Sequence, residues 1–521
     1  MKSSRQNKPR LHPRRPTPHA GIIASLAIFL LAGFGPMVAS SRSHLRGAVP
    51  EVPNGSTNNS SNSNALPIDL PTALSLVNTA NPTVALARAR LQEALARQRE
   101  AELLWLPNLQ AGPAYLRHDG QTQNSRGDVF GVSKSNFFMG GGAYLRWDTG
   151  NLLFDPLVAR QLSRAEAAQV QAVTDNLQLE VAVAYLDLLQ AHAQLAVNSE
   201  TIRNAKILLN FADAAREAGK SKGPADLPRA QSELESRQSE RVDLEVRAAA
   251  VSARLAQLLL LQPTVDLFPA DPAVVPLVLI PSTTSLDSLV DMALVNRPEL
   301  ARERALVTAA QARLRQARIS PFIPRLEFSY FSGDFGGGVN EALNQFSGRG
   351  DGLAQAIWEL HNLGAGDLAR VRTQRSLVNQ ANFHAMEVQA QISAEVAEAA
   401  KAILLRRQAL TNLQDAVRHA QESWRRLYEA TRGTIGVRGA TYDPIEALIA
   451  EQTLAQVRTQ YLTQLIEYNK AQFRLYTALG QPPVEALANI TTISVQVPAL
   501  PSPPPQDAKP TPPPKPEAPK K

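Results

Sequence analysis

The chain contains one internal duplication, and this repeat constrains its fold more than any other feature. The first copy opens with Leu70 and the pair Asn81-Pro82, and the second opens with Leu286 and the pair Arg297-Pro298 at the same spacing. Three further landmarks of the first copy recur in the same order in the second. Leu106-Pro107 corresponds to Ile323-Pro324, Trp147-Asp148 to Trp358-Glu359, and Gln262-Pro263 to Gln481-Pro482. Because the repeat is far longer than the roughly 20–50 residue periods of solenoids, the chain is predicted to contain two versions of one half-protein.

Each copy is predicted to contain one very long helix, over residues 156–218 in the first and 365–432 in the second. At 1.5 Å per residue each would be on the order of 100 Å long, so it needs a partner along its length. The apolar residues at heptad spacing are Leu177, Val181, Ala184, Leu188, Ala191, Leu195, Ile202, Ala205 and Leu209, and then Ile392, Val396, Ala399, Ile403, Leu410, Leu413, Val417, Ala420, Trp424 and Leu427. Asn198 and Arg406 interrupt the pattern. Sustained heptads predict coiled-coil packing.

Both long helices are predicted to end at glycine-containing breaks, at residues 219–224 and 432–439. Pro224 and Pro444 lie near the start of the helix that follows each break. Glycine after a helix and proline at the beginning of the next are the usual end and start signals. Each half is therefore expected to form an antiparallel helical hairpin with an exposed tip.

Two strand candidates precede each long helix, over residues 108–118 and 137–147 in the first copy and 325–335 and 352–360 in the second. Their length is close to the roughly 9–11 residues that cross an outer membrane at a tilt. Residues 119–136 and 336–351 are predicted to be polar loops between the strands. The aromatic residues near strand ends, where membrane-interface aromatics belong, are Tyr115, Tyr144, Trp147, Tyr330 and Trp358. Soluble hairpins with aromatic cores remain the alternative.

Four strands are too few to close a membrane barrel, because even the smallest bacterial barrels need about eight. A barrel made from this chain would therefore be shared between subunits. This argument predicts an oligomer and leaves the number of subunits open.

The remaining segments divide the chain into parts. Residues 1–42 are predicted to be a signal peptide, because a basic stretch precedes an apolar run that is shorter than the ~20 residues of a membrane-spanning helix. Residues 43–65 are predicted to form a Ser/Asn-rich disordered linker and 263–283 a Pro-rich linker. These segments flank the repeats, at 66–262 and 284–482, and residues 483–521 form a Pro/Lys-rich tail.

No pattern for catalysis, a cofactor or a metal is found. The chain has no cysteine, which excludes disulfides and thiol chemistry, and its histidines are scattered singly. Charged pairs such as Glu233 and Glu235 are predicted to lie on solvated helix faces. The net charge of +7 is concentrated toward the two ends of the chain, so no nucleic-acid partner is expected. The chain is therefore not expected to be an enzyme.

The ordered landmarks resemble those of the TolC-type outer-membrane efflux and secretion proteins over residues 68–479. The resemblance implies a mainly α protein with a small β part: a homotrimer in which four strands per chain form an oligomeric membrane β-barrel and the duplicated long antiparallel coiled-coil helices form an α-barrel. It implies an outer-membrane channel, with its helical part in the periplasm and outer-membrane lipid around its strands. Such a channel would serve a tripartite efflux or type I secretion system. A soluble periplasmic coiled-coil scaffold or adaptor is the alternative.

The same resemblance implies that the hairpin tips contact a periplasmic adaptor (membrane fusion) protein and an inner-membrane transporter. The tip residues that would dock the adaptor are Gly219, Lys220, Gly433 and Thr434. Only the glycines match the glycine-plus-aliphatic motif that the family carries there. Charges near converging tips would form rings by symmetry, so Asp226, Asp443 and Glu446 are candidate gate residues. The alternative is that they are N-terminal helix charges favoured by the helix dipole.

Overall fold

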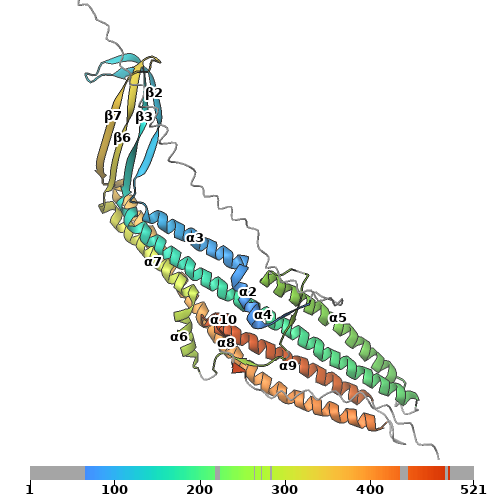
Figure 1. The fold of residues 1–521 in the computed structure, drawn as a ribbon. Coiled ribbons are helices and arrows are strands. Elements are labelled where there is room, and N and C mark those ends of the chain that lie inside the picture. The colour runs from blue at the N-terminus through green and yellow to red at the C-terminus, as the bar shows by residue number, and fades with distance from the viewer. Residues whose placement is uncertain are drawn as a thin grey trace, which may run out of the picture. The chain divides into compact units, whose positions relative to one another are not determined.

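The computed structural model describes residues 65–217, 223–262, 264–271, 273–281, 284–434, 444–486 and 491–492 of the chain (Figure 1). The chain divides into two units, residues 1–63 and 64–521, and every described residue belongs to the second. The predicted signal peptide, almost all of the Ser/Asn-rich linker and most of the Pro/Lys-rich tail lie outside the described residues.

The same order of elements occurs twice. The first half consists of α2 (Leu70–Ala80), α3 (Pro82–Glu102), β2 (Asn108–Gln123), β3 (Val129–Asp148), α4 (Thr149–Glu217) and α5 (Asp226–Leu259). The second half consists of α6 (Leu286–Asn296), α7 (Pro298–Ile319), β6 (Arg325–Val339), β7 (Asn344–Ile357), α8 (Ala365–Thr434) and α9 (Pro444–Ala478). Short 3-10 turns, η1 (Ser320–Phe322) and η2 (His361–Gly364), flank the second pair of strands.

The helix starts follow from capping residues in the sequence. The side chain of Asp69 accepts a hydrogen bond from the Thr72 N–H at 2.9 Å, and that of Asn81 accepts one from the Thr83 N–H at 2.9 Å. Asp and Asn stabilise helix N-termini because they satisfy N–H groups that have no partner within the helix. Asn81 ends α2 and caps the start of α3, so this one residue separates the two helices.

The two long helices are present, with 69 residues in α4 and 70 in α8. The predicted start of the first was wrong, because α4 begins at Thr149, directly after β3, and Pro156 lies inside it. The helix tolerates Pro156 at the cost of the hydrogen bond that a proline nitrogen cannot donate.

The helices form two antiparallel hairpins, α4 with α5 and α8 with α9, and α4 also packs against α3, α7 and α9 (Figure 1). Predicted heptad residues lie in two apolar cores: Val181 and Leu188 of α4 in one, and Ile392 and Val396 of α8 in the other. Asn198, one of the two polar interruptions, donates from Nδ2 to the Arg237 carbonyl of α5 at 3.3 Å. The other interruption, Arg406, pairs with Glu467 of α9 at 3.4 Å. Both interruptions therefore contact the partner helix, as coiled-coil seam positions do.

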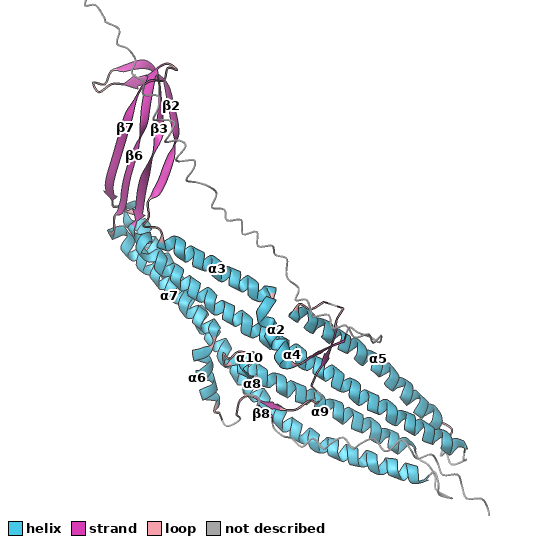
Figure 2. Ribbon diagram, in the orientation of Figure 1, coloured by secondary structure: helices cyan, strands magenta, loops and turns pink. Residues whose placement is uncertain are grey.

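The four long strands form one antiparallel sheet in the order β2-β3-β6-β7, grouped apart from the helices (Figure 2). The strands are longer than predicted, so most of the two expected polar loops is strand. The turns that remain are residues 124–128 and 340–343. Backbone pairing continues through polar sequence here because it depends on backbone groups of the neighbouring strand and not on the side chains.

The segment between the two repeats pairs with other parts of the chain in two small sheets. We call residues 264–271 and 273–281 the crossing segment. Its β4 (Asp266–Pro269) pairs in parallel with β1 (Ala65–Ile68), and its β5 (Leu277–Val278) pairs antiparallel with β8 (Thr491–Thr492). A short helix, α10 (Pro483–Ala486), precedes β8. The crossing segment is therefore fastened to both ends of the duplicated region. Among the described residues, no helix has an apolar stretch long enough to cross a membrane.

Candidate functional site

The four-stranded sheet has two chemically different faces near its helical end. Residues that pair across strands share a face, so the register assigns each side chain. The apolar face consists of the rows Trp147, Leu326 and Ala356; Leu145, Phe328 and Ala354; and Leu109, Ala143, Tyr330 and Gly352. A T-shaped contact between the rings of Trp147 and Phe328, with centroids 6.0 Å apart, lies on this face.

The opposite face is mainly polar. Its rows are Asp148, Arg325 and Ile357; Arg146, Glu327 and Gln355; and Asn108, Tyr144, Ser329 and Leu353. Arg146 Nε lies 3.2 Å from Glu327 Oε1, and Gln355 donates from Nε2 to Glu327 Oε2 at 2.6 Å. One face of the sheet thus suits hydrocarbon and the other suits water, which is the alternation of a membrane β-barrel wall.

Of the five predicted interface aromatics, Tyr144, Trp147, Tyr330 and Trp358 lie at this end of the sheet, with Tyr144 on its polar face. Trp147 and Tyr330 are on the apolar face, with Tyr330 61% exposed in the single chain. Trp358 follows the last residue of β7 and is 63% exposed. The indole N–H of Trp147 donates to the backbone carbonyl of Trp105 at 3.1 Å, which adds an aromatic residue that was not predicted. Exposed Trp and Tyr side chains at the same end of a sheet suit a membrane–water interface.

The two edge strands of the four-stranded sheet each have one edge without a partner strand in the single chain. In the part of the chain that the structure describes, β2 and β7 each pair on one side only.

The helical part also carries large exposed apolar residues, namely Leu86 of α3, Val242 and Val246 of α5, and Leu368, Phe383, Met386 and Leu404 of α8. Exposed apolar residues in such numbers mark an interaction surface.

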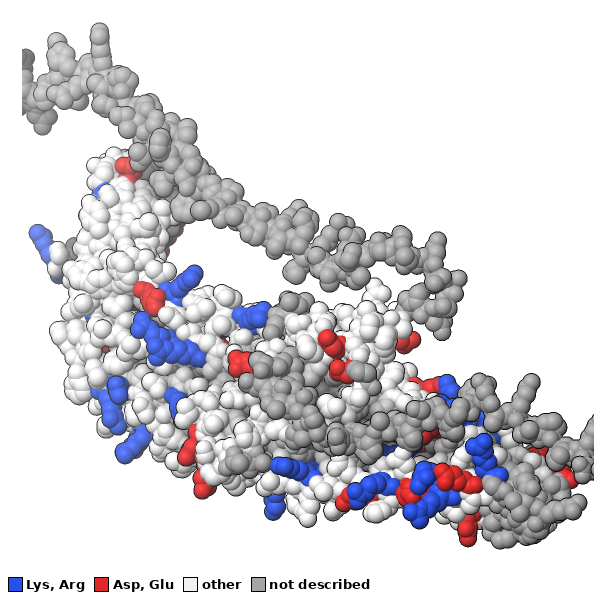
Figure 3. Space-filling view, turned by 60° about the horizontal axis from the view of Figure 1, so that its bottom comes forward, with Lys and Arg blue, Asp and Glu red and all other residues white. Residues whose placement is uncertain are grey.

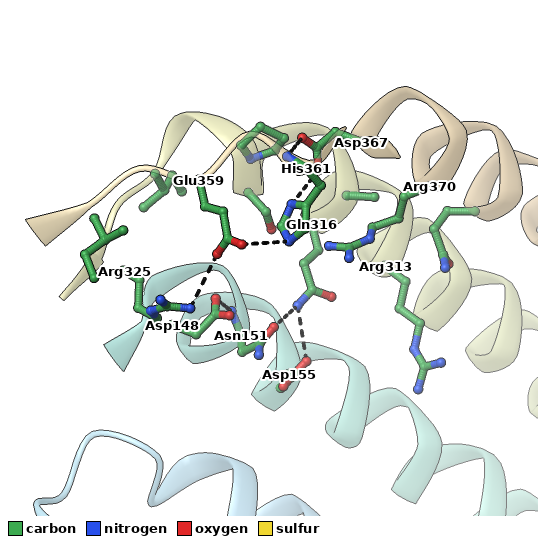
Figure 4. Close-up of a pocket in the computed structure, with 16 residues that line it drawn as sticks. Asp148, Asn151, Asp155, Arg313, Gln316, Arg325, Glu359, His361, Asp367 and Arg370 are labelled. Carbon is green, nitrogen blue, oxygen red and sulfur yellow. Dashed lines mark hydrogen bonds and ion pairs between the residues drawn. The ribbon is translucent and has the colours of Figure 1, made fainter. Parts of the chain in front are cut away.

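A polar pocket of about 310 Å³ lies where the sheet meets the helices (Figure 4). Asp155 of α4, Gln316 of α7 and His361 of the β7–α8 turn contribute to its lining. Gln316 Nε2 donates to Asn151 Oδ1 at 2.8 Å, and the His361 ring Nδ1 lies 3.1 Å from Asp367 Oδ1. These contacts tie α7 to α4 and the turn to α8. Burial raises the pKa of the Asp155 carboxyl.

The pocket is lined by the carboxylates Asp148, Asp155, Glu359 and Asp367. Its carboxylates are spread over its walls and are engaged with arginine, histidine and amide side chains. Throughout the described residues, no group of three or more His, Cys, Asp or Glu side chains is close enough to hold a metal ion. On the face of the molecule drawn in Figure 3, charged side chains are scattered over the helical part and are few on the sheet.

The predicted tip residues are described only in part. Gly219, Lys220 and Asp443 lie outside the described residues, and Gly433 and Thr434 are the last two residues of α8. Asp226 is buried in the first turn of α5, where its Oδ2 accepts a hydrogen bond from the Gly223 N–H at 3.1 Å. Glu446 is exposed in the first turn of α9.

A buried polar cluster between α4, α5 and α9 was missed by sequence reasoning. Glu233 was predicted to be solvated, but its side chain is only 13% exposed. It accepts from Arg237 Nε at 2.7 Å and from Gln452 Nε2 at 2.7 Å, which links α5 to α9. Beside it, Glu451 of α9 is 2% exposed. Burial raises the pKa of Glu451 to about 7; the charge of Glu233 acts in the same direction, while Arg237 and Arg458 oppose it.

Comparison with solved structures identifies the fold. The outer-membrane channel OprN is 21% identical, with a TM-score of 0.65, and the match covers 80% of this chain and 90% of that one. CusC, described in terms of folding and transmembrane channel formation, is 22% identical, with a TM-score of 0.65 and coverages of 82% and 96%. The Neisseria gonorrhoeae MtrE outer-membrane channel is 20% identical, with a TM-score of 0.63 and coverages of 80% and 89%.

The chain has a TolC-type fold. This finding confirms the predicted fold class, which combines duplicated long helices with a small antiparallel sheet. No protein-family model matches the sequence, and no curated protein sequence matches it significantly.

Proposed function

We propose that this chain is the outer-membrane channel component of a tripartite efflux or type I secretion system, acting as a passive exit duct. The observation that carries the proposal is the two-faced sheet whose strands run directly into the long helices: β3 ends at Asp148 and α4 begins at Thr149. A wall with one apolar and one polar face excludes lipid on one side and holds water on the other. The likeness to solved outer-membrane channels supports the same function.

The duct is completed by three copies of the chain. Four strands leave two open edges, β2 and β7, and an open edge is stable in a membrane only when another strand pairs with it. In a closed ring, β2 of one copy pairs with β7 of the next, so three chains supply twelve strands. The exposed apolar residues of α8, such as Phe383 (68%) and Met386 (62%), would pack against α3 and α5 of the neighbouring copy.

The ends of the helical hairpins are the proposed contact with a periplasmic adaptor protein, and through it with an inner-membrane transporter. Gly219, Lys220, Gly433 and Thr434 are the docking residues in this proposal. Asp226, Asp443 and Glu446 are the proposed gate charges, because symmetry would repeat each of them three times around a narrow opening. The sheet would lie in the outer membrane and the helical part in the periplasm.

Two adjacent residues of β6 allow a test with a matched control. Phe328 lies on the apolar face and Ser329 on the polar face. Phe328→Arg places a charge against lipid, at a cost of about 2–4 kcal/mol at mid-membrane and less toward the interface. We expect this variant to lose heat-resistant oligomer in detergent-extracted outer membranes. Ser329→Arg should assemble normally and change single-channel conductance in planar bilayers.

The proposal predicts a clear difference between these two variants. Equal assembly of both, together with unchanged conductance for Ser329→Arg, would contradict the assignment of the two faces. Release of the unmodified protein by osmotic shock, without detergent, would contradict the membrane location itself.

A further inference from the structure

An apolar groove of about 640 Å³ lies between α4, α8, α9 and the crossing segment. Its lining is mostly apolar and includes Leu189 of α4, Leu462 and Leu465 of α9, and Val274 of the crossing segment. Sites that bury a small organic molecule are typically clefts of roughly 300–1,000 Å³ with an apolar lining and a few polar groups. The groove therefore has the size and composition of a ligand site.

Polar contacts hold the crossing segment in place beside this groove. The hydroxyl of Tyr185 in α4 donates to Asp271 Oδ2 at 2.5 Å. On the other side, Asn469 of α9 accepts from the Leu277 N–H at 2.9 Å and donates to the Val275 carbonyl at 2.9 Å. Because these bonds reach both α4 and α9, they fix the crossing segment relative to the two helices that form the groove.

The groove is elongated along α4. Its lining residues Leu189, Ala193, Ala196, Glu200 and Arg203 are spaced by four, three, four and three positions. This spacing keeps side chains on one face of a helix. At a rise of 1.5 Å per residue the stripe is about 21 Å long. An extended apolar chain fits such a stripe better than a compact ring system does.

The charged residues lie at the two ends of the stripe. At one end, Arg458 of α9 pairs with Glu200 at 2.9 Å. Arg203, one turn further on, is exposed and has no ion pair among the residues that the structure describes, so this end has one positive charge in excess. The carboxylate of Asp271 lies at the opposite end, because it binds Tyr185, which precedes Leu189 by one helical turn. The two ends therefore favour a single orientation of an anionic ligand.

We propose that this groove binds a single-chain amphiphile with an anionic head group, of the fatty-acid class. The apolar chain lies along Leu189, Ala193 and Ala196 beside the crossing segment, and the head group contacts Arg203. Arginine suits this contact because its planar guanidinium forms charge-assisted hydrogen bonds with carboxylates. The inference does not depend on the proposed channel function, because a soluble scaffold with the same helices would have the same groove.

The absence of cysteine from the chain allows a test with a single introduced thiol. Ala196 lines the groove and is exposed, so Ala196→Cys should react with a water-soluble thiol reagent. Dodecanoate, added to protein held in amphipol so that no detergent micelles compete for it, should slow this reaction at least about tenfold by covering the thiol. The reaction of Ala89→Cys, on an exposed position of α3 outside the groove, should not change.

Chain length and head-group charge separate this site from non-specific binding. Each buried methylene strengthens binding about fourfold, so dodecanoate should protect Ala196→Cys at a concentration at least about tenfold lower than octanoate. Adding Arg203→Gln should raise the protective concentration of dodecanoate about tenfold and leave that of uncharged dodecanol unchanged. Arg164→Gln, which removes another exposed arginine of α4, is the matched control and should have no effect.

Several results would overturn the proposal. They are a failure of dodecanoate to protect Ala196→Cys, equal protection by the cationic dodecyltrimethylammonium, and equal effects of Arg203→Gln and Arg164→Gln. Labelling without any amphiphile tests a different occupant. If Ala196→Cys reacts slowly by itself and deletion of residues 493–521 makes it react fast, the chain's own tail fills the groove and the proposal is wrong.

Discussion

Lys470 of the second repeat reaches Asp187 of the first, with its Nζ 2.5 Å from Asp187 Oδ1. The same nitrogen lies 2.9 Å from Glu467 Oε1, and the lysine side chain is only 6% exposed. This buried contact between α9 and α4 joins the two repeats across the helical wall. A buried charge depends strongly on its partners, because the protein interior screens it poorly.

Lys470→Ala is expected to destabilise the protein by about 2–3 kcal/mol. Asp187 would lose its partner, although it is 40% exposed and keeps some contact with water, and Glu467 would keep only its pair with Arg406. The measurement is the melting temperature of the purified protein in detergent. Arg97→Ala is the control, since the pair with Glu93 is largely exposed and is worth about 0.5 kcal/mol or less. Equal effects of the two substitutions would contradict the role assigned to Lys470.

Glu451 is expected to make stability dependent on pH. Its folded-state pKa of about 7 lies above the ordinary value of 4.5, so the folded protein holds a proton that the unfolded chain releases. The stabilising effect of that proton is complete below the ordinary value and is lost as pH rises through about 7. Melting temperatures should therefore fall with rising pH in this window, and Glu451→Gln should reduce the fall. Glu93→Gln, on the exposed part of α3, should leave the pH dependence unchanged.

Gly142 is expected to tolerate no side chain. A Cβ at this position of β3 would overlap the backbone carbonyl oxygen of Tyr330 and lie 2.7 Å from Phe331 Cα, so the backbone of β6 would have to move. Gly142→Ala should therefore weaken the β3–β6 pairing by about 1–3 kcal/mol and lower the yield of assembled protein. At Gly112 of β2 a Cβ would have no heavy atom within 4 Å. Normal yield for Gly142→Ala, or an equal loss for Gly112→Ala, would be evidence against this close approach.

The proposed gate is tested by removing two charges together. Asp443→Asn combined with Glu446→Gln should raise the open probability in planar bilayers and weaken cation selectivity, because a ring of negative charge would be lost. Glu398→Gln, exposed near the middle of α8, is the control for a charge change away from the tip. If the double variant shows the open probability and selectivity of the unmodified protein, these residues act only as charges at a helix N-terminus.

Much of this fold could be predicted from the sequence because duplication and periodicity are local signals. The heptads located both hairpins. The alternation of the apolar residues Leu326, Phe328 and Tyr330 with Glu327 and Ser329 located the sheet. The lengths of the strands could not be predicted, because residues such as Gln121 and Gly348 pair through their backbones and leave no side-chain pattern. Caps at Asp69 and Ser285 marked the short helices α2 and α6, but each helix is only three turns long and was not expected.

The buried polar cluster could not be predicted for a different reason. Glu233 and Gln452 are 219 positions apart in the sequence, and each alone has the appearance of an ordinary charged or polar helix residue. Only the packing of α5 and α9 against α4 buries them together. The face assignment of Trp147 likewise depends on its pairing with Leu326 in the other repeat.

The mass of the purified mature protein in detergent, measured by native mass spectrometry, tests the central claim most directly. The claim is that one chain supplies an incomplete wall whose open edges, β2 and β7, are closed by identical neighbours. Three copies in a single particle are predicted. A stable single copy that remains dissolved after the detergent is removed would contradict it.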